Sequence, residues 1–100
     1  MKTIYKYVVL HGPINSFEMG KEVELAVPTG SEILTVAMQG IDLVAWVAIA
    51  DSGWNVSKLL RLWGTGNTIN SDFGGQETLK YISTVVVTPG LVIHAFEHLY

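Results

Sequence analysis

A glycine-flanked turn carries the ligand-binding chemistry that is easiest to identify in this chain. It follows an apolar run and consists of Gly64, Thr65, Gly66 and Asn67. The backbone N–H groups of such a turn can bind a phosphate, with hydrogen bonds from Thr65 and Asn67 and positive charge from Arg61 or Lys58. Two glycines also suit a purely structural turn or bulge, because glycine tolerates positive φ angles. The turn lacks the Gly-Lys-Ser/Thr of a P-loop and the third glycine of a dinucleotide fingerprint.

Two tryptophans near this turn could stack on a ligand ring. Trp54 follows a Ser-Gly pair, and Trp63 directly precedes the turn. Indole rings stack on bases and other flat ligands, although core or interface packing is the more common role of a single tryptophan. The candidate ligand-binding residues are therefore Trp54, Arg61, Trp63, Gly64, Thr65, Gly66 and Asn67.

Patterns typical of catalysis or metal binding are weak. The chain has no cysteine, which excludes a thiolate metal site and a cysteine nucleophile. His94 and His98 would share one face of a strand, but a rise of about 3.3 Å per residue places them about 13 Å apart, too far to bind one ion. No activated nucleophile is visible. We therefore expect a non-catalytic protein without a metal site or cofactor.

Short apolar and β-branched segments must position these residues. Together with intervening turn residues they predict strands at residues 3–10, 22–27, 32–38, 43–50, 81–88 and 91–98. Residues 39–42 indicate a tight reversal, Pro89 and Gly90 form the turn of the clearest hairpin, and residues 67–76 are expected to be a loop. The segment 43–50 is apolar on both faces, which is typical of a central strand covered on both sides or of an oligomer interface.

Alternation within two of these strands predicts which side chains share a face. The first strand would place Ile4, Val8 and Leu10 together. The third strand would place Leu34, Val36 and Met38 together.

Residues 56–63 fit either a helix or a strand. Val56, Leu59, Leu60 and Trp63 have helical spacing, with Asn55 as an N-cap and Gly64 as the residue after the last turn. In a strand, Val56, Lys58, Leu60 and Leu62 would instead alternate with Ser57, Leu59, Arg61 and Trp63. Periodicity alone slightly favours the helix.

The remaining composition limits the fold, location and partners. One hundred residues suit a single domain, residues 1–100, with one modest core. A hydrophobic fraction of 49% is high for this size, so we expect a homo-oligomer. The net charge is -3 and basic residues form no stripe, which argues against nucleic acid as a partner. The N-terminus does not resemble a signal peptide and no apolar run approaches the about 20 residues of a membrane helix, so we expect a soluble cytoplasmic protein with no membrane partner.

Several short motifs resemble a family of small bacteriophage and prophage proteins of unknown function. The motifs are a Lys-Tyr start, a proline followed by a Leu-x-Val strand, a Gly-Thr-Gly turn and a His-x-Phe-Glu ending, here at Lys6-Tyr7, Pro28 with Leu34 and Val36, residues 64–66, and residues 94–97. Asn67 and Thr68 replace the usual His-Pro after the turn, and the chain continues past Glu97. The resemblance favours a strand at residues 56–63. The chain is then expected to be all-β, a small sandwich or barrel of about seven mostly antiparallel strands.

The resemblance implies a viral protein acting in the host cytoplasm with no assigned enzymatic activity. By analogy with other small oligomeric phage proteins, we expect a binder that sequesters a small nucleotide-like, cyclic nucleotide signal and thereby evades host anti-phage defence. The alternative is a protein-interaction or minor virion component that binds a host or phage protein. That alternative predicts an apolar patch around residues 43–50 and no enclosed polar pocket.

Overall fold

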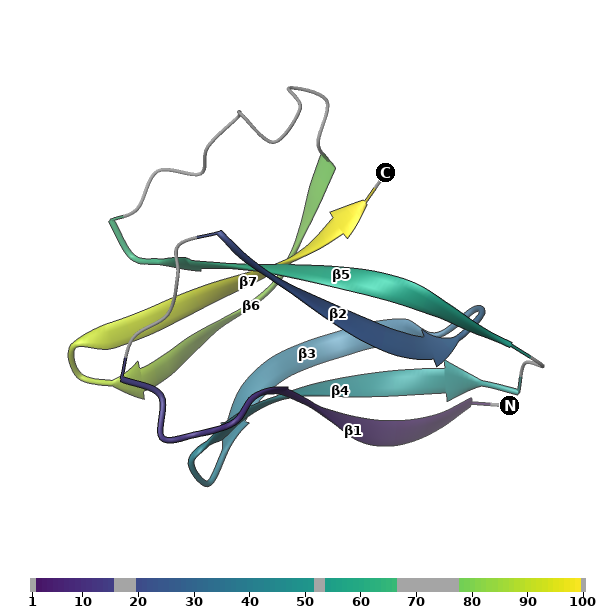
Figure 1. The fold of residues 1–100 in the computed structure, drawn as a ribbon, viewed down its shortest axis with the longest axis horizontal. Coiled ribbons are helices and arrows are strands. Elements are labelled where there is room, and N and C mark those ends of the chain that lie inside the picture. Colours follow the sequence, from purple (N-terminus) through teal and green to yellow (C-terminus); the bar gives the residue numbers. More distant parts are fainter. Residues whose placement is uncertain (1, 16–19, 52–53, 67–77, 100) are drawn as a thin grey trace.

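The computed structural model describes residues 2–15, 20–51, 54–66 and 78–99. Within these ranges the chain forms strands and no helix (Figure 1). The strands are β1 (Lys2–Leu10), β2 (Lys21–Pro28), β3 (Glu32–Gln39), β4 (Asp42–Ala50), β5 (Asn55–Gly64), β6 (Thr78–Thr88) and β7 (Leu91–Leu99).

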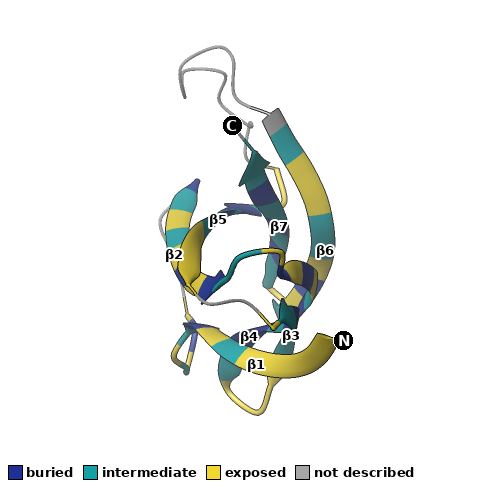
Figure 2. Ribbon diagram, turned by 90° about the vertical axis from the view of Figure 1, so that its right-hand side faces the viewer, coloured by how far each residue is buried: buried dark blue, intermediate teal, exposed yellow. Residues whose placement is uncertain are grey.

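The strands form two antiparallel sheets, which confirms the all-β fold class. One sheet has three strands in the order β1-β4-β3, and the other has four in the order β2-β5-β7-β6. Figure 2 shows buried residues mainly on β4, β5 and β7, whereas β1 is largely exposed. β4 is thus the central strand of its sheet, as its two apolar faces predicted.

Side chains from both sheets meet in one apolar core. Their alternation along each strand points every second residue toward the other sheet. The buried members are Val9, Ile14, Leu25, Val27, Ile33, Val36, Leu43, Ala45, Val47, Leu60, Leu62, Val85, Ile93 and Ala95.

Residues 56–63 lie in strand β5, and the helical spacing of their apolar residues has a different cause. Leu60 and Leu62 point into the core between the sheets, while Leu59 and Trp63 are buried on the opposite face. A strand covered on both faces shows apolar residues at adjacent positions, and these mimic the i, i+3, i+4 spacing of a helix.

A register shift in β1 makes the predicted shared face wrong for Leu10, although Ile4 and Val8 do share one face. Residues Ile4 and Val8 are exposed, and Ile4 retains 60% of its accessible surface. The pairing with β4 shifts between Val8 and Leu10, so Leu10 lies opposite Leu43 and packs against the core beside Val9. An extra residue in one strand changes which side chains share a face, and composition does not reveal it.

A second register shift corrects the prediction for β3. It falls between Ile33 and Thr35, so Leu34 is exposed whereas Ile33 and Val36 are buried. Leu34 and Val36 therefore lie in different environments, although simple alternation places them together.

Both short hairpins form where the turn residues predicted them. Gln39 pairs with Asp42 across a turn in which Gly40 has a φ of 61°, a value that L side chains rarely adopt. Thr88 pairs with Leu91 across Pro89 and Gly90. The loop expected at residues 67–76 lies outside the described residues.

The segment after β1 packs tightly against the β3–β4 turn. The backbone N–H of Gly12 donates a hydrogen bond to the Asp42 carboxylate at 2.8 Å. A Cβ atom on Gly12 would lie 1.7 Å from the Ile41 carbonyl oxygen, so only glycine fits there. Ile14 follows and enters the core.

On one side of the molecule, hydrogen bonds of Ser83 join the two sheets. The Ser83 hydroxyl of β6 donates to the Val36 carbonyl of β3 at 2.7 Å and accepts from the Val36 N–H at 3.0 Å. These bonds satisfy backbone groups at the free edge of β3. The β3 and β6 edges are therefore joined, while β1 and β2 are the free edges on the other side.

Candidate functional site

The Gly64, Thr65, Gly66 turn closes β5 against β7. Gly64 pairs with Ile93, and the Thr65 N–H donates to the Val92 carbonyl at 3.3 Å. Gly66 has a φ of 87° and open space around its Cα, so its backbone conformation, not packing, requires glycine. Thr65 and Gly66 are exposed, but the Thr65 N–H already has a protein acceptor. Asn67 lies outside the described residues.

Arg61 is held by groups of the protein itself. Its guanidinium forms an ion pair with Glu22, with Nη2 and Oε2 2.9 Å apart, and also donates to the Gly20 carbonyl at 3.3 Å. Glu22 lies directly opposite Arg61 in the β2–β5 register. The side chain of Arg61 is only 12% exposed, so its charge is largely enclosed and balanced.

Trp63 is the buried end of an aromatic row on the outer face of the four-stranded sheet. Only 2% of its surface is accessible. Its ring meets Phe96 edge to face at a centroid distance of 5.7 Å, and Phe96 meets Tyr81 in the same way at 5.7 Å. The face of the indole is thus packed against the protein and is not open to a stacked ligand from solvent.

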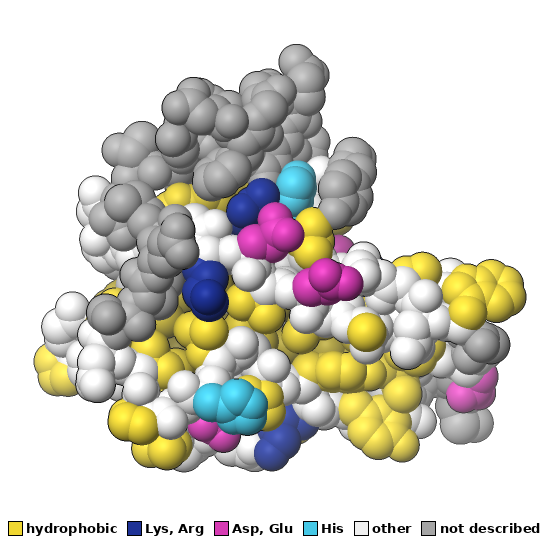
Figure 3. Space-filling model, viewed as in Figure 1, with side chains coloured by type: hydrophobic (Ala, Val, Ile, Leu, Met, Phe, Trp, Pro, Cys, Tyr) yellow, Lys and Arg dark blue, Asp and Glu magenta, His cyan; other side chains and the backbone are white. Residues whose placement is uncertain are grey.

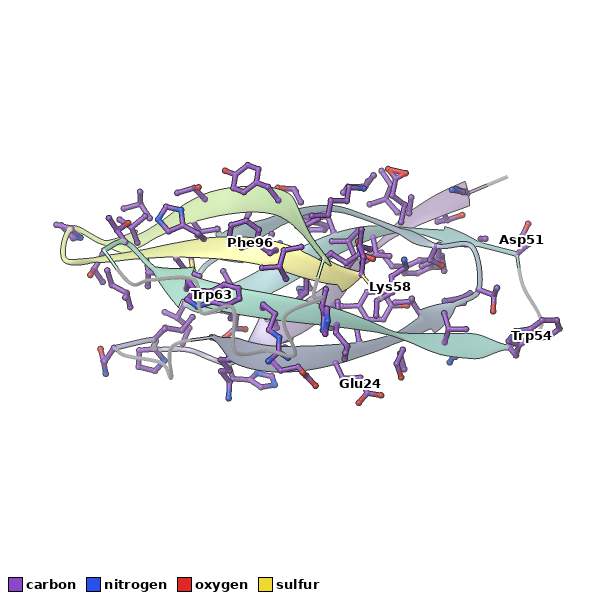
Figure 4. All side chains as sticks on the ribbon, turned by 90° about the horizontal axis from the view of Figure 1, so that it is seen from above. Glu24, Asp51, Trp54, Lys58, Trp63 and Phe96 are labelled. Atoms are coloured by element: carbon purple, nitrogen blue, oxygen red, sulfur yellow. The ribbon has the colours of Figure 1, made fainter. Side chains whose placement is uncertain are left out.

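The two tryptophans do not lie together. Trp54 is 69% exposed just before β5, whereas Trp63 lies near the other end of the same strand (Figure 4). Nine residues of extended strand separate them by about 30 Å. The stacking platform expected from their closeness in sequence is therefore not formed.

A chain of hydrogen bonds beside the turn was not expected from the sequence. His94 Nε2 is 2.7 Å from the Thr65 hydroxyl, and His94 Nδ1 is 3.0 Å from the Thr84 hydroxyl. Thr84 is in turn 2.7 Å from the Tyr81 hydroxyl. Both nitrogens of His94 thus meet threonine hydroxyls, and this arrangement lacks the carboxylate that orients a catalytic histidine.

The pairing of Thr84 with His94 depends on another register shift. Counting back from the Thr88–Leu91 hairpin would place Thr84 opposite Ala95. The shift between Val86 and Thr88 moves the partner to His94. The turn residues alone therefore could not have identified this contact.

A small pocket of about 170 Å³ lies away from all of these residues. It lies between the segment that follows β1 and the two hairpin turns, and its lining is Pro13, Ile14, Asn15, Met38, Gly40, Ile41, Val87 and Thr88. The lining carries no charged side chain. It therefore suits an apolar group and not an anionic ligand.

The outer face of the three-stranded sheet is apolar at its centre. On this face strand register places Ile4, Lys6, Val8, Glu32, Thr35, Ala37, Val44, Trp46 and Ala48, together with Lys2, Gln39, Asp42 and Ala50 at the strand ends. Trp46 lies in the middle strand, between Lys6 on β1 and Thr35 on β3. Val44 and Ala48 are buried although they face away from the core.

Lys6 spans part of this outer face. Its Nζ donates to Gln39 Oε1 on β3 at 2.7 Å, so the side chain crosses β4, the strand between β1 and β3. The aliphatic stem of a lysine can cover apolar surface in this way. It covers the face beside Val44 and leaves Ile4 and Val8 exposed.

The described residues contain neither a metal-binding cluster nor a membrane-spanning helix. No group of three or more histidine, cysteine, aspartate or glutamate side chains there could hold a metal ion. The described ranges also contain no helix with the length and hydropathy needed to cross a bilayer.

One known protein family matches this chain over nearly its whole length. A family described as a domain of unknown function, DUF7352, matches residues 1–99. Comparison with curated proteins and with solved structures gives no match. The chain therefore belongs to the DUF7352 family.

Proposed function

We propose that this chain is a non-catalytic protein-interaction domain that binds its partner through the outer face of the three-stranded sheet. The observation that carries the proposal is Trp46, which lies at the centre of that face with Val44 and Ala48 on either side along β4. Exposed Ile4 and Val8 extend the apolar surface along β1. Exposed apolar side chains beside a partly exposed aromatic residue are typical of protein-binding sites.

The contacts of the predicted ligand-binding residues support protein binding over anion binding. Arg61 is paired with Glu22, and Trp63 is buried against Phe96. A ligand would have to break the ion pair and open the aromatic row before it could use either residue. On the sheet face Ile4 and Val8 are already exposed, and a partner would have to displace only the Lys6–Gln39 hydrogen bond to reach the surface that Lys6 covers.

Affinity capture with matched variants tests this proposal. Thr35 lies directly opposite Trp46, so Thr35→Glu places a carboxylate at the centre of the outer face. Thr88→Glu makes the same change at an exposed position on the other sheet. We expect a captured protein, once purified, to bind the wild type and Thr88→Glu alike, and Thr35→Glu at least tenfold more weakly, about 1.4 kcal/mol. Equal binding by both variants would refute the proposal.

A small nucleotide-like ligand is the second candidate function. The observation in its favour is the exposed Thr65 and Gly66 turn beside the hydrogen-bonded His94. Cyclic dinucleotides and ADP-ribose derivatives would be added at large excess while the melting temperature is measured. A ligand that binds the native state must raise it. An unchanged melting temperature across the panel would eliminate this candidate.

The sequence resemblance supports a further proposal about the setting of this binding. We propose that the protein comes from a bacteriophage, acts in the host cytoplasm and binds a host or phage protein, either free or as a minor virion component. Mass spectrometry of purified virions and of infected cells separates the two locations. Absence from both would contradict the proposal.

A further inference from the structure

The free edges of the two sheets lie on the same side of the molecule. β1 is one edge of the three-stranded sheet and β2 is one edge of the four-stranded sheet. Neither pairs with another described strand along its outer edge. The opposite side is joined by Ser83 and Val36, so among the described residues the sheets have free edges at β1 and β2, here called the open side.

The open side exposes apolar side chains that face the core. Tyr5 pairs with Val47, a core residue, and therefore points inward, yet it remains 53% exposed. Tyr7 and Val23 are only partly buried against the core. Figure 3 looks onto this side and shows hydrophobic atoms between β2 and β1. Free strand edges beside uncovered apolar surface are sites at which another strand adds.

We propose that a second copy of this chain covers the open side. A two-fold axis along the strands would place β1 of each protomer beside β2 of its partner, so that both free edges are paired at once. β1 and β2 run in opposite directions in Figure 1, which makes both contacts antiparallel. The arrangement is isologous and closed, because each protomer contributes the same two strands.

Strand lengths and charges select one register for this contact. Pairing all 8 residues of β2 with residues 2–9 of β1 sets Lys6 opposite Glu24 of the partner on the outer face. On the inner face it sets Tyr5 opposite Leu25 and Tyr7 opposite Val23. Two pairs of apolar side chains therefore meet inside and Lys6 meets Glu24 outside, while Lys21 lies opposite Val9 at the end of the contact.

The bonds within one chain leave Lys6 and Glu24 able to form this pair. Lys6 donates to the neutral amide of Gln39, and Glu24 accepts from the Ser57 hydroxyl. Exchanging a neutral acceptor for a carboxylate strengthens the bond of Lys6. The alternative is a pairing of β1 with β1 of the partner, centred on Ile4. It would set Lys2 opposite Lys6, and the repulsion between the two positive charges disfavours it.

Cysteine cross-linking tests the register directly, because the chain has no native cysteine. In the proposed register Ile4 lies opposite Ala26 of the partner, and both are exposed in one chain. Ile4→Cys and Ala26→Cys proteins would be mixed under mild oxidation. We expect a disulfide-linked dimer from the mixture, at least tenfold more than from either variant alone. A mixture of Ile4→Cys with Val86→Cys, an exposed position on β6, is the matched control and should cross-link only at the background level.

Sedimentation equilibrium provides the second measurement. The wild type should have twice the 11.0 kDa mass of one chain. Lys6→Glu and Glu24→Lys should each raise the dimer dissociation constant about tenfold, and the double variant should restore it, because the opposed charges are exchanged. Thr35→Glu should not change the mass, which separates this contact from the proposed partner-binding face. A monomer at all concentrations, or a dimer without selective cross-linking, would overturn the proposal.

Discussion

Gly12 is the residue at which the fold tolerates least change. A Cβ atom there would meet the backbone of Ile41, 1.7 Å from its carbonyl oxygen and 2.4 Å from its carbonyl carbon. Backbone atoms cannot rotate away as a flexible side chain can. The Gly12 N–H is also bonded to Asp42, so moving the segment breaks that hydrogen bond.

We therefore predict that Gly12→Ala lowers the free energy of unfolding by about 3 kcal/mol, the upper range of overpacking costs. Gly90→Ala is the control, because its Cβ would meet nothing within 4 Å and its φ is not positive. The control should stay within about 0.5 kcal/mol of the wild type. Urea unfolding followed by circular dichroism measures both, and equal midpoints would disprove this account of the segment.

At the same scale, the sequence identified plausible ligand-binding residue types but not their surroundings. Arg61 has the charge for anion binding, yet Glu22 lies opposite it in a strand that is distant in sequence. Trp54 and Trp63 are near each other along the chain and far apart along an extended strand. Partners of this kind depend on strand pairing, which one sequence does not reveal.

At the scale of elements, the positions of the turns were easier to predict than the side of each strand on which a given side chain lies. Glycine and proline mark both hairpins, and apolar or β-branched segments mark every described strand except β5, whose periodicity also fits a helix. Leu10 and Leu34 were misplaced because each lies at a register shift. The ambiguity at Asn55–Gly64 arose because both faces of β5 are buried.

Ser83 offers a test of how the two sheets are joined. Ser83→Ala removes both hydrogen bonds between Ser83 and Val36. The partly buried N–H and C=O groups of Val36 then lose these hydrogen-bond partners. We predict a loss of about 2 kcal/mol in the free energy of unfolding.

Ser57→Ala is the matched control for this change. Its hydroxyl bonds the exposed Glu24, so its loss should cost less than about 0.5 kcal/mol. Thermal or urea unfolding compares the two variants. If they are equally stable, the Ser83 contact does not join the sheets in solution.

At the scale of the whole molecule, two partly exposed apolar surfaces agree with a composition that is 49% hydrophobic. The outer face of the three-stranded sheet is centred on Trp46, and the open side exposes Tyr5 between β1 and β2. Composition predicted that such surface exists, because a chain of this length cannot bury so much apolar area alone. Sheet order was needed to locate it, since β1 pairs with β4 and β2 pairs with β5.

The tryptophans provide the most direct test of the proposed function, because they report on three different regions. Trp46 lies on the proposed binding face, Trp54 is exposed before β5, and Trp63 is buried beside the turn. Protein labelled with 5-fluorotryptophan would be titrated with its purified partner and followed by fluorine NMR, with each resonance assigned by a Trp→Phe variant. We predict that the partner shifts the Trp46 resonance and leaves that of Trp63 in place. A shift of Trp63 without any change at Trp46 would contradict binding through the three-stranded sheet.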